Sequence, residues 1–340
     1  MRVAVARNCS FAGTSNVFGR ACTEVGAEDT AQMTAEALRD QGHTVMVCEG
    51  DKDLLPLLEQ FMPTRNGHPT GMVFNLARGI QGECGRSHVP AMLEMAGFPY
   101  TGASPFGHVL TLDRAVARAL LRQAGAPTPN HCVTRQPGDL IDRLAFPLIV
   151  KPRFAQTDFP GHIVRSPRQL ADAIAEVVDA CEQEALVEEY IDGVEISVSL
   201  LGNDQQMEFL PLTEQRAGDG TSEIALASMG EDLALRIRAS ALATFQTCRC
   251  QDYARIDFRV DGDGTPLVVG IESMPPLDLE GAYVLAAAAA GHDQATVVQR
   301  ILDAAHCRYF GVPSPRFDSP SFEALVEDDV LKHAGEPERP

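Results

Sequence analysis

A β-hairpin with charged side chains is the part of the sequence that could do chemistry. The residues on both sides of the turn Asp261-Gly-Asp-Gly264 alternate between apolar and polar types, which is typical of two antiparallel strands. Side chains two positions apart share a face, so Arg255 and Asp257 lie together on the first strand. Gly270 and Glu272 share a face of the second strand. Because Mg²⁺ accepts carboxylates together with phosphate oxygens, the hairpin predicts a metal site, with a structural Arg–Asp pair as the alternative.

Lys151 is a candidate phosphate ligand. Lysine is scarce in this chain, which has only Lys52, Lys151 and Lys332, and Lys151 alone follows an apolar run, Phe146-Pro-Leu-Ile-Val150. A strand that ends in a compact ammonium group and continues into a loop with Gly161 could bring that charge to a phosphate. The alternative is an ordinary surface lysine at the end of a strand.

The acidic segment from Leu186 to Glu195 combines a strand, a short connector and a further carboxylate. Backbone groups of Glu188–Ile191 could meet an adenine edge, and the Glu195 carboxylate could take ribose hydroxyls. An acidic edge strand with a turn at Asp192-Gly193 is the alternative.

The composition limits the classes of protein that fit. A chain of 340 residues with 45 % hydrophobic content exceeds the size of one core, so we expect two or three domains. The net charge of -19 argues against nucleic-acid binding and anionic membranes. We find neither a signal-peptide pattern nor an apolar run long enough to cross a membrane, and we expect a cytoplasmic protein. The nine scattered cysteines indicate reduced thiols rather than a disulfide framework or a zinc site.

Periodicity along the chain predicts three folded units and a tail. Residues 1–109 alternate strand and helix as a βαβαβ parallel sheet, which is an α/β pattern. Residues 110–185 form a small α+β unit, with a helix over 113–124 and a helix that Ser166 caps. Residues 186–311 are rich in strands and include one expected over 208–213. Residues 312–340 are rich in proline and acid, and we expect a mobile tail with one short helix over 322–331.

An ordered series of short motifs over residues 1–311 resembles the D-alanine-D-alanine ligases, which are ATP-grasp enzymes. The motifs are Phe74-Asn-Leu with the Gly79–Gly85 loop, Leu93-Glu with Pro99-Tyr-Thr-Gly102, Leu112-Asp-Arg114, Pro127-Thr-Pro129, Pro147–Pro152, Val187–Glu195 and Ala254-Arg-Ile-Asp257. The resemblance implies a three-part ATP-grasp fold, with an N-terminal parallel-sheet domain followed by two α+β units that clamp ATP between two sheets.

The resemblance also assigns roles to residues. ATP binding falls to Arg114, Lys151, Glu188, Glu189, Tyr190, Ile191 and Glu195. Among these, Lys151 would contact phosphate, Glu188–Ile191 would face adenine, and Glu195 would take the ribose. Arg114 stands where these ligases usually have lysine.

The remaining implied roles concern the reaction centre. Arg255 would be the catalytic residue that stabilises acyl-phosphate and tetrahedral charge. Asp257 and Glu272 would hold Mg²⁺, with Mn²⁺ as an alternative, and Arg78 and Glu83 would contact substrate. The implied partners are ATP, a small carboxylate and a small amine, and a homodimer is a further expectation.

Several positions depart from the family pattern. The family has glutamate at position 270 and asparagine at position 272, whereas this chain has Gly270 and Glu272, so the net ligand charge is expected to be unchanged and one metal to be held. The loop Phe154–Gly161 contains acid and proline where serine and glycine are usual, which predicts a weaker phosphate grip. The loop 8–16 lacks the glutamate that these ligases use for an ammonium group, so D-alanine is unsupported as substrate.

Two functional hypotheses follow. The first is an ATP-dependent carboxylate–amine ligase that activates a small acid as an acyl phosphate. The second is a non-catalytic ATP-grasp homologue that binds nucleotide weakly or not at all and acts as a regulatory or scaffold subunit. The enzyme requires Asp257 and Glu272 to converge within metal-ligand reach, about 2.1 Å each, whereas the non-catalytic protein does not.

Overall fold

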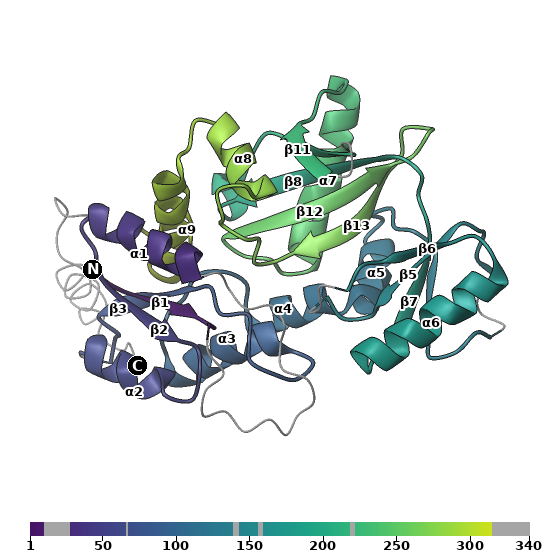
Figure 1. Ribbon diagram of the computed structural model, residues 1–340. Helices are drawn as coiled ribbons and strands as arrows, with labels where there is room; N and C mark the ends of the chain where they lie inside the picture. The colour runs from purple at the N-terminus through teal and green to yellow at the C-terminus, as the bar shows by residue number, and fades with distance from the viewer. Residues whose placement is uncertain (10–27, 66, 139–142, 156–158, 218–221, 315–340) are drawn as a thin grey trace, which may run out of the picture.

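Three β-sheets follow one another along the chain in a computed structural model of the protein (Figure 1). The structure describes residues 1–9, 28–65, 67–138, 143–155, 159–217 and 222–314. Residues 315–340 of the expected tail, with the helix expected over 322–331, lie outside these residues, as does most of the loop 8–16. No helix in the described ranges is long and apolar enough to cross a membrane.

The N-terminal sheet is parallel, with strand order β2-β1-β3. Val3 of the central strand β1 lies between Val45 of β2 and Met72 of β3. The residues Val3 to Ala6 of β1 are buried on both faces of the sheet, which is why this stretch of sequence is continuously apolar. The elements are β1 (Arg2–Arg7), α1 (Glu28–Asp40), β2 (Thr44–Glu49), α2 (Leu54–Phe61), β3 (Gly71–Asn75) and α3 (Gly85–Ala96). The predicted βαβαβ arrangement is confirmed.

The central unit is a four-stranded antiparallel sheet of order β4-β7-β5-β6 with α6 packed on it. Ser166 caps α6 by accepting from the Gln169 amide, and Asp113 caps α5 by accepting from two amides of its first turn. The elements are α4 (Pro105–Leu112), α5 (Arg114–Gln123), β4 (His131–Thr134), β5 (Leu148–Pro152), β6 (His162–Val164), α6 (Pro167–Cys181) and β7 (Ala185–Glu189). Helix α4 was not expected.

The C-terminal sheet is antiparallel, of order β11-β10-β8-β12-β13, with β9 beside β8. The prediction of one strand over 208–213 was wrong. Two strands form instead, because the intervening Pro211 lacks the N–H that a continuous hydrogen-bond ladder needs. The elements are β8 (Val194–Leu201), η2 (Asp204–Gln206), β9 (Glu208–Phe209), β10 (Thr213–Ala217), β11 (Ser222–Leu226), α7 (Glu231–Thr247), β12 (Tyr253–Val260), β13 (Pro266–Glu272), α8 (Ala282–Ala289) and α9 (Gln294–Phe310). The predicted hairpin is β12 and β13.

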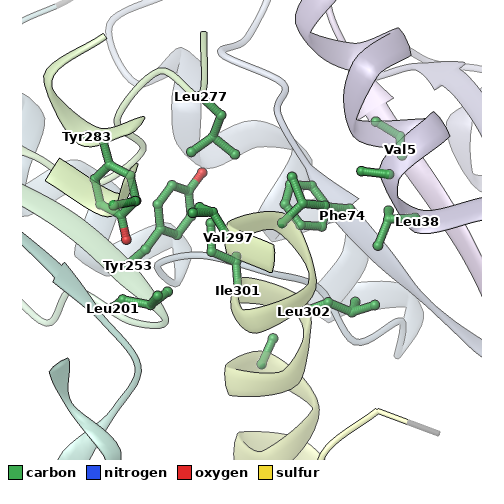
Figure 2. Close-up of a cluster of buried hydrophobic side chains, with 14 of the residues drawn as sticks. Val5, Leu38, Phe74, Leu201, Tyr253, Leu277, Tyr283, Val297, Ile301 and Leu302 are labelled. Atoms are coloured by element: carbon green, nitrogen blue, oxygen red, sulfur yellow. The ribbon is translucent and has the colours of Figure 1, made fainter. Parts of the chain in front are cut away.

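One hydrophobic cluster joins the N-terminal sheet to the C-terminal sheet (Figure 2). Phe74 of β3 and Tyr253 of β12 belong to it, and Ile301 of α9 lies between them. Asp252, which is fully buried, adds a polar junction beside this cluster: it accepts from the Gly102 amide over 2.8 Å and from Arg308 Nη2 over 2.7 Å. The central unit has a separate core between its sheet and α6.

Candidate active site

A cleft of about 340 Å³ lies between the four-stranded sheet and the C-terminal sheet. Its walls come from α5, β5, the β7–β8 connection, β12 and β13. The structure brings together most of the residues that the sequence singled out, namely Arg114, Lys151, Glu188, Glu189, Tyr190, Ile191, Glu195, Arg255, Asp257 and Glu272. Segments more than a hundred residues apart in the sequence thus share one cavity.

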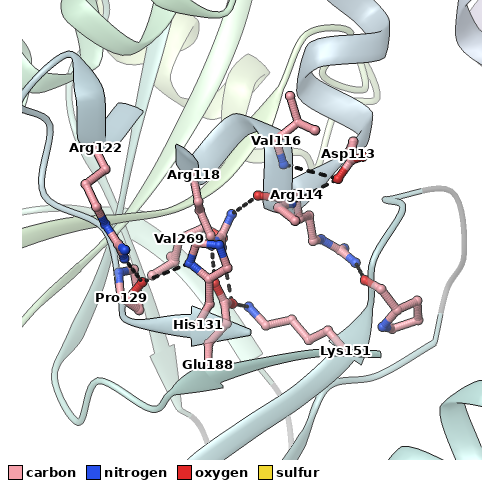
Figure 3. Close-up of polar contacts among 12 residues, drawn as sticks. Asp113, Arg114, Val116, Arg118, Arg122, Pro129, His131, Lys151, Glu188 and Val269 are labelled. Carbon is pink, nitrogen blue, oxygen red and sulfur yellow. Dashed lines mark hydrogen bonds and ion pairs between the residues drawn. The ribbon is translucent and has the colours of Figure 1, made fainter. Parts of the chain in front are cut away.

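Glu188 is the centre of one end of the cleft, which we call the lysine end (Figure 3). Its carboxylate accepts from Lys151 Nζ over 2.9 Å, and Arg118 of α5 donates to both of its oxygens. The side chains of Glu188 and Arg118 are 1 % and 2 % exposed, so this ion pair is buried. Burial opposes ionisation of Glu188, but the charges of Arg118 and Lys151 prevail and lower its pKa to about 2.

Three cations, Lys151, Arg114 and Arg118, lie at the lysine end together with the Glu188 carboxylate. Arg114 lines it beside Lys151 and Arg118, and it donates to the Pro152 carbonyl over 2.6 Å. Burial lowers the pKa of Lys151 below that of a free lysine, although the Glu188 carboxylate opposes that shift. Arg114 lies in the first turn of α5, where the helix dipole disfavours a cation. The stability of the helix therefore does not explain why an arginine stands at this position. Three cations around one carboxylate suit a phosphate-binding surface.

The β7–β8 connection forms the wall expected to face adenine. The Glu189 amide donates to the Asn130 carbonyl over 3.0 Å, and the Tyr190 amide donates to the Pro147 carbonyl over 2.9 Å. Arg259 donates to Glu195 Oε2 over 2.9 Å, and its guanidinium lies 5.2 Å from the centre of the Tyr190 ring. These contacts fix the connection in place before any ligand binds.

The opposite end, which we call the hairpin end, begins with Asp257. Arg255 donates through Nε to Asp257 Oδ1 over 2.8 Å and through Nη2 to Oδ2 over 3.2 Å. Ser197 of the neighbouring strand β8 donates to Oδ1 over 2.7 Å. The structural Arg–Asp pair considered from the sequence is therefore formed in this structure.

Gly270 lies directly opposite Asp257 in the β12–β13 register. A β-carbon at position 270 would lie 2.8 Å from Asp257 Oδ2 and 3.2 Å from its Cβ. The Asp257 carboxylate thus occupies the space into which a side chain at position 270 would project. A side chain at this position would require the Asp257 carboxylate to shift from the place that it takes in its pair with Arg255.

Glu272, at the end of β13, is held from the N-terminal domain. Arg86 of α3 pairs with its Oε1, which also accepts from the Met274 amide over 3.2 Å. Burial opposes ionisation, but the guanidinium groups of Arg86, Arg78 and Arg255 hold the pKa of Glu272 below its usual value. The net charge of minus two for the ligands Asp257 and Glu272 stays a prediction, and Arg86 pairs with Glu272 in this structure.

The residues present suit one divalent cation. In the described part of the chain, no group of three or more His, Cys, Asp or Glu side chains could hold a metal. Asp257 and Glu272 both line the cleft, and Mg²⁺ commonly takes one or two carboxylates and completes its shell with water and phosphate oxygens. A second ion bridged by residue 270 does not fit, because glycine supplies no ligand.

Two predicted substrate residues lie outside the set that lines the cleft. Arg78, on the β3–α3 connection, donates to the Met274 carbonyl over 3.2 Å, and Glu83 is exposed on the same connection.

Sequence reasoning missed Arg118 and Arg86. Arg118 left a signal, because it interrupts the apolar face of α5 beside Ala117 and Leu121. Arg86 left none, since its partner lies in another domain.

Comparison with known proteins agrees with this geometry. The family model described as D-ala D-ala ligase C-terminus matches residues 120–303, more than half of the chain. The uncharacterized protein y4sG of Sinorhizobium fredii is 45 % identical over 332 residues, which cover 92 % of this chain and 98 % of that protein. The D-alanine–D-alanine ligase of Moorella thermoacetica is 28 % identical, over 80 % of this chain and 91 % of that ligase.

Solved structures show the same fold. The D-alanine–D-alanine ligase of Bacillus anthracis, in complex with ATP, has a TM-score of 0.74 at 21 % identity and covers 90 % of this chain and 96 % of its own. The VanG D-Ala:D-Ser ligase of Enterococcus faecalis has a TM-score of 0.69 at 18 % identity and covers 89 % and 99 % of the two chains. The three-part ATP-grasp fold is therefore confirmed, and the chain belongs to the D-alanine–D-alanine ligase family.

Proposed function

We propose that this protein is an ATP-dependent carboxylate–amine ligase. The observation that carries the proposal is the single cleft that joins a cationic lysine end to the Arg255, Asp257 and Glu272 side chains of the hairpin end. Family membership supports the same reaction class. The departures in the substrate loops leave the identity of the small carboxylate and amine open to experiment.

Each residue that lines the cleft would have a role set by its position. Lys151 and Arg114 would bind ATP phosphates, the β7–β8 connection would hold the adenine, and Glu195 would orient the ribose. Asp257 and Glu272 would hold one divalent cation, which when bound offsets phosphate charge. Binding would transfer the Arg255 guanidinium from Asp257 to the reacting anion, because one guanidinium cannot serve both fully.

The proposed reaction has two steps. A carboxylate oxygen attacks the γ-phosphorus of ATP, the bond between that phosphorus and the β,γ-bridging oxygen breaks, and ADP leaves. The amine then attacks the acyl carbon, the carbon–oxygen bond to phosphate breaks, and phosphate and a proton are released. Arg255 would stabilise the negative charge that develops in both steps.

A second candidate function rests on the hairpin end. Both of its carboxylates are already paired with arginine, and position 270 carries no ligand. These features favour a non-catalytic homologue in which the cleft binds nucleotide without turnover. The cytoplasmic location, the homodimer and the domain bounds 1–109, 110–185, 186–311 and 312–340 stay predictions.

Magnesium-dependent ADP release, measured over a panel of amino-acid and hydroxy-acid pairs, separates the two functions. The ligase predicts release on at least one pair, and Arg255→Met should abolish that release while ATP still binds. ATP binding without ADP release on any pair would favour the non-catalytic homologue. Absence of ATP binding would contradict the ligase and leave a non-catalytic homologue that does not bind nucleotide.

A further inference from the structure

Arg86 is an unusual residue for its position in α3. It lies in the first turn of the helix, where the dipole disfavours a cation, and its side chain is 2 % exposed. Burial of a guanidinium is costly unless an anion compensates it. It pairs with Glu272 of β13, which lies 186 residues further along the chain. Neither the stability of α3 nor the packing of the N-terminal sheet explains this arginine.

The Arg86–Glu272 pair has a fixed geometry. Arg86 and the Met274 amide both donate to Oε1, so among the described residues Oε2 accepts no hydrogen bond. The next residue, Ser273, is fully buried, and its hydroxyl lies 2.9 Å from His108 Nδ1 and 2.8 Å from Thr111 Oγ1. Glu272 therefore has one committed oxygen, an anchored backbone and one oxygen left for a ligand in the cleft that it lines.

We propose that Arg86 is a positioning residue that makes Glu272 act as a neutral oxygen ligand for the divalent cation. The guanidinium cancels the charge of the carboxylate and holds one oxygen, while the other oxygen coordinates. The pair thus supplies one oxygen donor with no net charge, as an asparagine amide would. This inference rests on the proposed ATP site, and it adds a residue from the N-terminal domain to that site.

The proposal predicts that cation affinity follows the net charge of the pair. Arg86→Met leaves a charge of minus one and should bind cations most tightly. The native pair and the double variant Arg86→Met with Glu272→Asn are both neutral and should bind alike. Glu272→Asn alone gives the pair a charge of plus one and should bind most weakly. Each unit of charge should change the dissociation constant by roughly tenfold, because the guanidinium lies at ion-pair distance from the ligand oxygen.

The experiment is a Mn²⁺ titration followed by electron paramagnetic resonance, first with Mn²⁺ alone and then with a non-hydrolysable ATP analogue. Arg86→Lys keeps the charge and should resemble the native protein, which keeps the test usable if Glu272→Asn fails to fold. Arg308→Met is the matched control, because it breaks the partly buried Arg308–Asp252 pair away from the cleft and should leave Mn²⁺ affinity unchanged.

Four outcomes are informative. The proposal is supported if Mn²⁺ binds most tightly to Arg86→Met, less tightly and equally to the native protein and the double variant, and most weakly to Glu272→Asn. A Mn²⁺ affinity for Arg86→Met within twofold of the native value overturns it, as does weaker binding by that variant. A double variant far from the native value also overturns it. If the ATP analogue does not bind but the order holds with Mn²⁺ alone, the proposed function fails and this inference survives.

Discussion

The two ends of the cleft use similar residues with different charge balance. At the lysine end, Arg118 and Lys151 share the single carboxylate of Glu188, and Arg114 adds a further cation. At the hairpin end, Asp257 and Glu272 each have an arginine of their own. The first arrangement shares one carboxylate between two cations, which suits an anionic ligand. The second is neutral overall, so small changes of charge there should alter which ions bind.

The largest expected effect is loss of the shared carboxylate at the lysine end. Glu188→Gln leaves Arg118 and Lys151 buried without their anion, and we expect the free energy of unfolding to fall by about 3 to 5 kcal/mol. Urea denaturation measures this change. Glu189→Gln alters the next residue, whose side chain makes solvent-exposed hydrogen bonds, and should cost less than about 1 kcal/mol. Equal losses in the two variants would refute the distinction.

Acid should remove the same stabilisation. The pKa of Glu188 is about 2 in the folded protein against 4.5 ordinarily, so the stabilisation is present above pH 4.5 and is lost as the pH falls through 2. The shift corresponds to about 3 kcal/mol. The difference in unfolding free energy between the native protein and Glu188→Gln, measured from pH 6 downward, should shrink over this window. Parallel pH profiles would show that Glu188 is not the titrating group.

The lysine end should also dominate nucleotide affinity. Lys151→Ala removes a phosphate cation while Arg118 still neutralises Glu188, so ATP binding should weaken by about 1.5 to 3 kcal/mol with little loss of fold stability. Isothermal titration calorimetry measures the affinity. Lys52→Ala is the control, because Lys52 is exposed and lies outside the cleft. Unchanged ATP affinity in Lys151→Ala would exclude Lys151 as a phosphate ligand.

The smallest effect concerns the space above Gly270. In Gly270→Ala the new methyl group would meet Asp257 Oδ2, so the carboxylate must shift away from Arg255 at a cost of about 1 kcal/mol. Gly262→Ala, in the turn of the same hairpin, meets no atom within 4 Å and is the control in thermal unfolding. An equal loss in an Asp257→Ala background would show that this contact is not the cause.

Local patterns predicted the strands and the residues on them, but not the partners of those residues. Alternation placed Arg255 beside Asp257 because that contact depends only on strand geometry. Helix α4 was missed because its apolar sequence has no clear polar face, although the Ser104 cap before Pro105 was a readable signal. The pairing of Arg86 with Glu272 depends on the packing of two domains, and no local period encodes it.

The cluster in Figure 2 has a consequence for motion. Because α9 and its apolar neighbours bridge the N-terminal and C-terminal sheets, and the Asp252–Arg308 pair reinforces the junction, separating those sheets would expose a large apolar surface. Helix α5 packs through Ala117 and Leu121 into the core of the C-terminal sheet and stays with it. The four-stranded sheet has a core of its own, and the buried Arg118–Glu188 pair rather than this shared cluster links it to α5. Opening the cleft would move Lys151 relative to Arg255 and leave the Arg86–Glu272 contact intact.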